Sequence, residues 1–311
     1  KLIPLEIKTY PSGQRVYDWT IPKEWNIKDA WIKNSKGEKI VDFKNSNLHV
    51  VSYSMPVRKK IKLKDLQEKL HFIKNIPNAI PYRTSYYEEN WGFCLSYDHF
   101  KEYFHENEEY EVCIDSELKK GKLHFGELLI NGKNKKEYLI SCYICHPSMA
   151  NDSLSGVILT AFLSKYLLDK REELEHSYRI IFVPETIGAI SYLANNESAM
   201  KKIDSGLVIT TAGGPGKIGF KQSFNKAHEI NQIIEDVLIK NHVDYIKHPF
   251  DIRGSDERQY SSPGFRINVA TITKDKYYDY DYYHTSLDDL KFVKANYINE
   301  TLNYYIEVLD V

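Results

Sequence analysis

The sequence has 311 residues, of which 42% are apolar, and its charged residues nearly balance to a formal net charge of −1. This apolar content supports a sizeable hydrophobic core and excludes a disordered chain, and the charge excludes a basic surface that would attract nucleic acid or an anionic membrane. No apolar stretch of the sequence approaches the roughly 18–20 residues that span a bilayer.

The cysteines and the N-terminus indicate the compartment. Four cysteines, Cys94, Cys113, Cys142 and Cys145, are few for a chain of this length, and this scarcity is typical of a reduced, cytoplasmic protein. The Cys142–Cys145 spacing alone fits redox chemistry or half of a zinc site. Both lie on a predicted strand, where their side chains point to opposite faces, so we expect a structural role for them. The N-terminus shows no basic-then-apolar signal pattern.

The first part of the chain is rich in aromatic residues, short apolar runs and turns. A strand at 5–9 comes first, and a β-rich region follows from 19 to about 106. Within it we expect three strands and one short helix, at 30–32, 39–43, 48–53 and 63–73. We predict that residues 19–106 form a small module inserted into a core made of residues 1–18 and 107–311.

From about residue 109 the pattern changes to alternating strands and helices. The expected strands are 110–114, 122–130, 138–145, 178–183, 206–210 and 268–272. The expected helices are 155–169, 187–195, 229–241 and 297–308. This alternation predicts an α/β fold with a largely parallel sheet that helices cover on both faces. Ligands bind to such sheets at the carboxyl ends of the strands.

Three loops that follow buried strands carry residues suited to metal binding or proton transfer. His146 and Asp152 follow the strand at 138–145, and an imidazole and a carboxylate are good zinc ligands. Glu185 ends the next strand, where it could act as a general base. His284 lies in an aromatic, acidic loop. Each also has an ordinary explanation: Asp152 as a helix cap, Glu185 as a first-turn carboxylate and His284 as a surface histidine.

The order of these loops resembles the co-catalytic zinc aminopeptidase and glutaminyl cyclase superfamily. In that superfamily a first His precedes a bridging Asp in an Asn-Asp…Ser-Gly context, here residues 151–156. A catalytic Glu follows in a Glu-Glu-x-Gly context, here 185–188. A Ser-Asp segment precedes the last strand, here 254–260, and the last ligand is the His of a Tyr-His-Thr…Asp motif, here 283–288.

A closer resemblance covers nearly the whole chain. It is to the bacterial aminopeptidase-like proteins that are often encoded near surface-polysaccharide or flagellar glycosylation genes. The matching segments are 18–25, 47–51, 80–87, 91–94, 144–148 and 254–260. That family has a peptidase core interrupted early by a small β module, often followed by a C-terminal winged-helix domain. Because the sequence stops at Val311, we expect this last domain to be absent or very short.

Two departures from the superfamily's pattern reduce the expected number of metal ions. The second Glu of the superfamily, a zinc ligand, falls on Thr186, and no acid occupies 210–214, where another carboxylate ligand is expected. Two zinc ions that share a bridging carboxylate need roughly three protein ligands each. The resemblance therefore implies one zinc ion, held by His146, Asp152 and His284.

The function that this resemblance implies is zinc-dependent hydrolysis of an amide, peptide-like bond in a small substrate. Zinc lowers the pKa of its bound water and polarises the scissile carbonyl. Glu185 then takes the proton of the metal-bound water and passes it to the leaving amine, unless it serves as a fourth ligand. We expect Asp256, Arg258 and Tyr260 to bind the substrate's charged end or the oxyanion. An ion pair of Arg258 with Asp256 or Glu257 is an equal alternative.

Two other functions stay open at this point. The missing carboxylates favour a non-catalytic binding or scaffold protein on the same fold, and a single zinc ion also suits an acyl transferase or cyclase. We expect a small-molecule or short-peptide substrate and no nucleic-acid or membrane partner, and the oligomeric state stays open. We also expect the β-rich module to overhang the cleft, with His49 and Arg83 as candidates to reach it.

Overall fold

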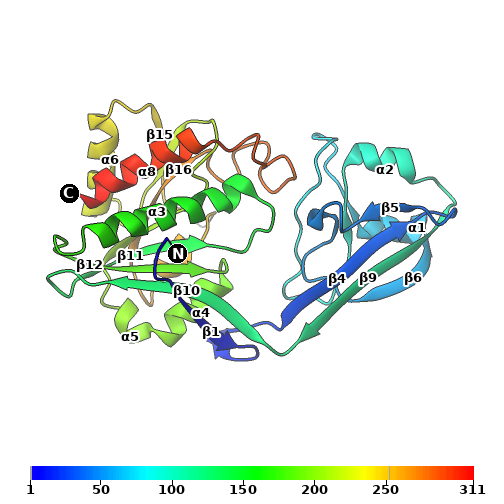
Figure 1. Ribbon diagram of the computed structural model, residues 1–311, viewed down its shortest axis with the longest axis horizontal. Helices are drawn as coiled ribbons and strands as arrows, with labels where there is room; N and C mark the ends of the chain where they lie inside the picture. The colour runs from blue at the N-terminus through cyan, green and yellow to red at the C-terminus, as the bar shows by residue number, and fades with distance from the viewer. Residues whose placement is uncertain (1, 252) are drawn as a thin grey trace.

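In the described residues of this computed structural model, 2–251 and 253–311, a mixed eight-stranded sheet forms the centre of the larger region in Figure 1. Its strands are β1 (Glu6–Pro11), β10 (Lys122–Ile130), β11 (Glu137–Tyr143), β12 (Ser177–Val183), β13 (Ser205–Val208), β14 (Ile218–Lys221), β15 (Tyr245–His248) and β16 (Asn268–Lys274). They lie in the order β1-β10-β12-β11-β13-β16-β14-β15. Strands β12, β11, β13 and β16 pair in parallel at the centre, and the antiparallel pairs lie toward the two edges.

Helices cover both faces of this sheet. Those on one face are α3 (Gly156–Asp169), α6 (Glu229–Lys240) and α8 (Ala295–Leu309), and those on the other are α4 (Ile187–Asn195), α5 (Glu197–Met200) and α7 (Glu257–Tyr260). In α3, Leu159, Leu163 and Leu167 recur every fourth residue and therefore face the same core. Every residue of β12 and β16 is buried, as expected for strands covered on both sides. The predicted α/β class with helices on both faces is confirmed.

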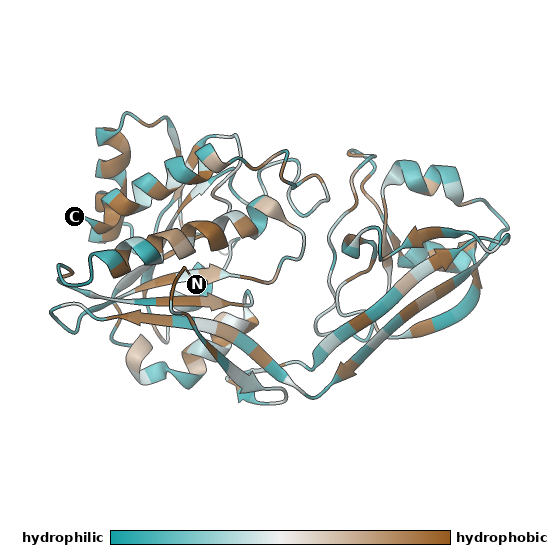
Figure 2. Ribbon diagram, viewed as in Figure 1, coloured by the Kyte–Doolittle hydropathy of each residue, from teal (hydrophilic) through white to brown (hydrophobic). Residues whose placement is uncertain are grey.

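The second region is built, within the described part of the chain, on a four-stranded antiparallel sheet with its own apolar core. Its order is β5 (Lys39–Asp42), β4 (Glu24–Lys33), β9 (Glu109–Lys119) and β6 (Val57–Lys62). Hydrophobic and hydrophilic residues alternate along β4 and β9 (Figure 2), which is typical of a sheet with one face on a core. Because β9 pairs with β4 and β6, this sheet extends to Lys119, past the expected module boundary at Glu106.

Short elements complete the two regions. Strands β2 (Arg15–Val16) and β3 (Trp19–Thr20) pair with each other and pack against the core of the larger region beside α4. Around the smaller sheet lie η1 (Asn47–His49), α1 (Leu63–Leu66), η2 (Gln67–Lys69), β7 (Leu70–His71), β8 (Phe93–Cys94) and α2 (Tyr97–Tyr103). The strand expected at 48–53 is instead the helical turn η1, because the Ser46 hydroxyl accepts the N–H of Leu48 at 3.3 Å and starts a turn there. The helix expected at 63–73 ends at Leu66 and continues only as the turn η2.

The two regions touch beside the loop that carries His284. The N–H of Tyr82 donates to the carbonyl oxygen of His284 at 2.7 Å, and the N–H of Ser286 donates to the carbonyl oxygen of Ile80 at 2.8 Å. These bonds join a loop of the smaller region to a loop that follows β16. In the residues that the structure describes, no helix is both long and apolar enough to cross a membrane.

Candidate functional site

Three candidate ligands come together next to the carboxyl ends of the central strands. His146 follows β11, Asp152 lies in the irregular turn η3 (Ala150–Ser155), and His284 lies in the loop after β16. One ligand atom from each lies within 4.8 Å of the others. The ring centroids of His146 and His284 are 4.9 Å apart. Loops that are far apart in the sequence therefore place two imidazoles and a carboxylate around one point.

Two polar atoms in this cluster have only each other as a partner among the described residues. His284 Nε2 lies 3.0 Å from Asp152 Oδ2, and Asp152 is only 1% exposed. Apart from this mutual contact, neither atom has a hydrogen bond to any described residue. Buried polar atoms are almost always paired. His284 Nε2 and Asp152 Oδ2 are therefore well suited to coordinate a metal ion such as zinc.

The other carboxylate oxygen of Asp152 is already occupied. Oδ1 accepts a short hydrogen bond from the hydroxyl of Tyr143, and that hydroxyl accepts one from Thr210 Oγ1 at 2.5 Å. Burial and the charge of Asp152 raise the pKa of Tyr143 well above its usual value, which keeps the phenol protonated as a donor. Burial alone would raise the pKa of Asp152, but the nearby His146 and His284 imidazoles and this hydroxyl hold it below its usual value.

Asp288 fixes the backbone that carries Asp152. Its carboxylate accepts the N–H of Asn151 at 2.6 Å and the N–H of Asp152 at 3.0 Å. Asp288 follows His284 closely in the chain, so this residue ties two ligand-bearing loops together. Helix α3 has Ser155 as its N-cap and no side-chain capping bond. The helix-cap explanation for Asp152 is therefore not what the structure shows.

Glu185 lies beside the cluster at the end of β12. Its Oε2 is 3.6 Å from His146 Nε2, and its side chain is 25% exposed, so it stays accessible from the cleft. It lines a cavity of about 420 Å³ together with His146 and His284. Burial and the negative charge of Asp152 raise the pKa of Glu185, against the opposing influence of His146. A carboxylate with a raised pKa is better suited to accept a proton near neutral pH.

The structure places two of the expected substrate-binding residues in the core instead of on this cavity. Asp256 is fully buried and accepts the N–H of Thr186 at 2.7 Å, and burial with the nearby charge of Glu185 raises its pKa well above the usual value. Tyr260 is also fully buried, with its hydroxyl 2.8 Å from Ser141 Oγ. Helix α7, which begins directly after Asp256, turns this segment inward. Neither side chain is among those that line the cavity next to Glu185, and in this structure both pack and position the segment. Their contact with a substrate stays a prediction.

Arg258, the third of these residues, lies in α7 and is partly buried. Burial raises the pKa of both Glu185 and Asp256, and the positive charge of Arg258 opposes this rise. Glu257, one of its alternative partners, is instead held by Lys221 Nζ at 2.7 Å. The side chain of Arg258 is not among those that line the cavity next to Glu185.

Sequence reasoning missed Tyr82, which supports both imidazoles from the smaller region. Its ring lies 5.4 Å from that of His146 and 5.2 Å from that of His284, centroid to centroid, with edge-to-face geometry. Tyr82 lies in the 80–87 segment that carried the family resemblance, which is the signal that could have found it. Of the two residues expected to reach the cleft, Arg83 lines the cavity, whereas His49 is buried with Nδ1 2.8 Å from the carbonyl oxygen of Cys94.

Comparison with known proteins adds a family context to this geometry. Residues 1–311 match the model of a family described as a domain of unknown function, DUF4910. A protein of Clostridium acetobutylicum named polysaccharide biosynthesis protein with aminopeptidase-like domain is 46% identical over 309 residues, which are 99% of this chain and 70% of that protein.

Solved structures show the same fold. A crystal structure described as a peptidase from Clostridium acetobutylicum has a TM-score of 0.94 at 46% identity, and the match covers 99% of this chain and 72% of that one. A zinc aminopeptidase from Bacillus subtilis has a TM-score of 0.68 at 11% identity, over 98% of this chain and 83% of its own. The last similarity is one of fold alone.

Proposed function

Because the chain belongs to the DUF4910 family of proteins with an aminopeptidase-like domain, we propose that it is a zinc-dependent hydrolase that cleaves an amide bond in a small substrate. One observation carries this proposal. One ligand atom each of His146, Asp152 and His284 converges within 4.8 Å, and the buried Asp152 Oδ2 and His284 Nε2 have no other partner among the described residues than their mutual contact at 3.0 Å. Two imidazoles and a carboxylate that converge in this way are a donor set suited to zinc.

The donor set fits one zinc ion. Two imidazoles and one carboxylate are three protein ligands, which leaves the open position typical of catalytic zinc. A second ion bridged by Asp152 would need Oδ1, and the hydroxyl of Tyr143 already occupies that oxygen. Thr186 and Thr210 are the residues where further acidic ligands would be expected, and neither carries a carboxylate. These features support a single ion.

Within this proposal, a bound zinc ion supplies Lewis acidity, which polarises a carbonyl and lowers the pKa of water. Glu185 takes the proton of the attacking water and delivers it to the leaving amine. Asp256 fixes the backbone directly after Glu185 by accepting the N–H of Thr186. Tyr82 and His284 are joined through their backbones, so the smaller region holds one imidazole in place. The cavity of about 420 Å³ suits a small substrate.

Elemental analysis of the purified protein after dialysis tests the metal site. We expect one zinc ion per chain, and His284→Ala should remove most of it. His228→Ala is the matched control, because His228 belongs to a separate, more exposed group with Asp204 and Glu229. A ratio near two would contradict the single site. A ratio near zero, or equal loss in both variants, would contradict the ligand set and favour the scaffold alternative.

The acyl transferase or cyclase alternative requires a different readout. Turnover of small amides and N-acyl compounds in ¹⁸O-labelled water should place the label in the acid product, because hydrolysis adds a water oxygen to the acyl carbon. A product without the label would favour acyl transfer or cyclisation on the same residues.

A further inference from the structure

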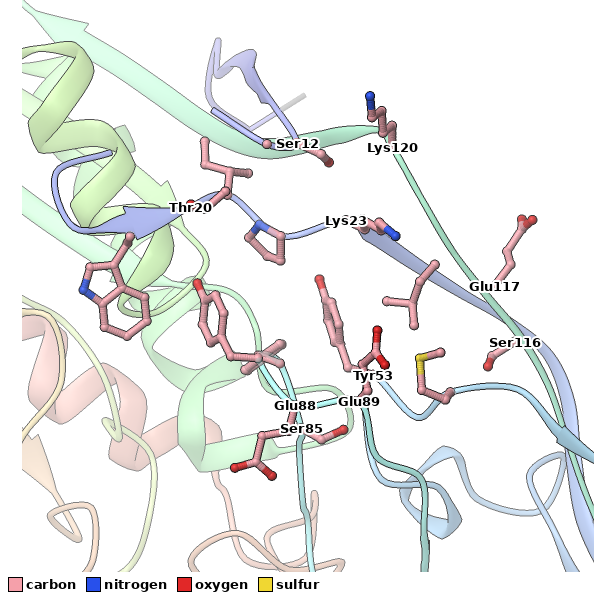
Figure 3. Close-up of a pocket in the computed structure, with 18 of the residues that line it drawn as sticks. Ser12, Thr20, Lys23, Tyr53, Ser85, Glu88, Glu89, Ser116, Glu117 and Lys120 are labelled. Carbon is pink, nitrogen blue, oxygen red and sulfur yellow. The ribbon is translucent and has the colours of Figure 1, made fainter. Parts of the chain in front are cut away.

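A larger cavity of about 890 Å³ adjoins the one next to Glu185. Trp19, Tyr86 and Tyr87 line both cavities, so the two are parts of one cleft that these rings divide. We call the larger part the outer chamber. Figure 3 shows it between the segment that carries Thr20 and Lys23 and the loop of the smaller region that carries residues 85–89. Nothing in the proposed hydrolysis uses this volume.

The wall of the outer chamber contains aromatic rings held by one another. Trp19 and Tyr87 contact edge-to-face with centroids 5.1 Å apart, and Tyr53 and Tyr86 do so at 4.6 Å. Tyr87 is nevertheless 53% exposed, so much of its surface is open to the chamber. Large, oriented and partly open aromatic surfaces are suited to binding a flat or ring-shaped ligand.

The charged groups of the outer chamber are mostly carboxylates. Asp18, Glu88 and Glu89 line it, and in the described residues their side chains make no ion pair or hydrogen bond. Glu117 also lines it and pairs with Lys119 at 3.0 Å. Carboxylates outnumber the lysines of the lining, so the chamber disfavours an anionic ligand. An ionised carboxylate is an acceptor only, and serine, threonine and lysine side chains of the same lining can donate, so the chamber favours an uncharged ligand that presents both donors and acceptors.

A saccharide ring matches both features. Its faces carry C–H groups that pack on aromatic rings, and its edges carry hydroxyl groups that donate to carboxylates. A purely apolar ligand would desolvate the carboxylates without replacing their hydrogen bonds, which is costly.

We propose that the outer chamber binds an uncharged saccharide unit, and that the substrate of the inner site is an N-acylated amino sugar that carries this unit. The second statement rests on the proposed amide hydrolysis, whereas the first does not. In the reaction the C–N bond of the acylamino group breaks. The oxygen of water bonds to the acyl carbon, and the nitrogen gains a proton, which yields a carboxylic acid and a free amino sugar. The cavity next to Glu185 opens into the outer chamber at Trp19, Tyr86 and Tyr87, so a saccharide bound there would have its acylamino group within reach of the inner cavity.

Calorimetric titration with N,N′-diacetylchitobiose, an uncharged N-acylated disaccharide, tests the saccharide site. We expect binding both to the metal-loaded protein and after metal removal by a chelator, because the outer chamber contains none of the proposed ligands. Tyr87→Ala should weaken binding by about 3- to 10-fold through loss of ring contact. Tyr103→Ala is the matched control, since Tyr103 is an exposed tyrosine of the same region that does not line the cleft.

Three results would overturn the saccharide site: no binding of the disaccharide, tighter binding of trialanine amide than of the disaccharide, or equal affinity of Tyr87→Ala and the parent protein. Release of acetate from the disaccharide by the metal-loaded protein then tests the substrate class. Binding without acetate release would refute the assigned substrate and leave the saccharide site standing, so failure of the hydrolase proposal is distinguishable from failure of the site.

Discussion

Glu127 and Asp152 are both buried carboxylates of the same sheet region, but their partners differ. Glu127 is 4% exposed and is bound by Lys8, Tyr192 and Arg179. Arg179 also donates from Nε to Glu137 at 2.7 Å. The Glu127 cluster, which consists of these residues, thus joins β1, β10, β11, β12 and α4. Asp152 Oδ2, by contrast, has only its contact with His284 Nε2 among the described residues.

The difference separates a structural cluster from a functional one. A fully bonded network in a low dielectric stabilises the fold, and removing one member leaves a buried charge without compensation. A carboxylate oxygen and an imidazole nitrogen with no partner but each other keep capacity to bind a ligand or a metal ion. Substitutions in the Glu127 cluster should therefore lower stability, whereas substitutions at the site should lower zinc binding or turnover.

The largest effect should come from Glu185→Gln, which keeps the shape but removes the proton acceptor. Turnover should fall by about 10²–10⁴-fold, with zinc content and thermal stability unchanged. Glu137→Gln, at the margin of the Glu127 cluster, is the control and should leave turnover unaltered. If Glu185 is a fourth ligand, zinc content falls as well. Unchanged turnover with a loss of about 0.3–1 kcal/mol of stability would instead identify a helix-start carboxylate.

Arg179→Met and Asp152→Asn should differ in their effect on the stability of the metal-free protein, with the larger loss in the Glu127 cluster. Arg179→Met leaves Glu127 undercompensated, and we expect it to lower the free energy of unfolding by about 3 kcal/mol. Asp152→Asn keeps an amide oxygen that accepts from Tyr143 and leaves no buried charge unpaired, so it should lower stability by less than Arg179→Met does while abolishing zinc binding. Urea unfolding measures the first quantity and elemental analysis the second. Equal destabilisation would mean that both clusters are structural.

The smallest expected effect is on the stability of the fold at low pH. Burial alone would raise the pKa of Glu127, but its bonds with Lys8 and Tyr192 and the charge of Arg179 outweigh burial and hold it below the usual value. A carboxylate with a lowered folded-state pKa stabilises the fold above its unfolded pKa, and this contribution is lost as the pH falls through the folded value. Between pH 7 and pH 3 the parent protein should therefore lose more stability in urea than Glu127→Gln. Parallel losses would contradict this.

The α/β core and the meeting of His146, Asp152 and His284 could be predicted because strand-end loops of a parallel sheet share one edge. Whether these residues bind zinc stays a prediction. The contact of Tyr82 with both imidazoles could not be predicted, since it depends on how a separate sheet docks against the core. Nor could the burial of Tyr260, because a short helix decides which way that segment turns.

The backbone bond between Tyr82 and His284 also has a consequence for the order of biosynthesis. The ribosome makes residues 24–119, with their own sheet and apolar core, before any of β11 to β16. Nascent chains generally acquire structure from the N-terminal side first. The surface around Tyr82 is therefore synthesised before the loop that docks on it, and His284 is the last of the three proposed ligands to leave the ribosome.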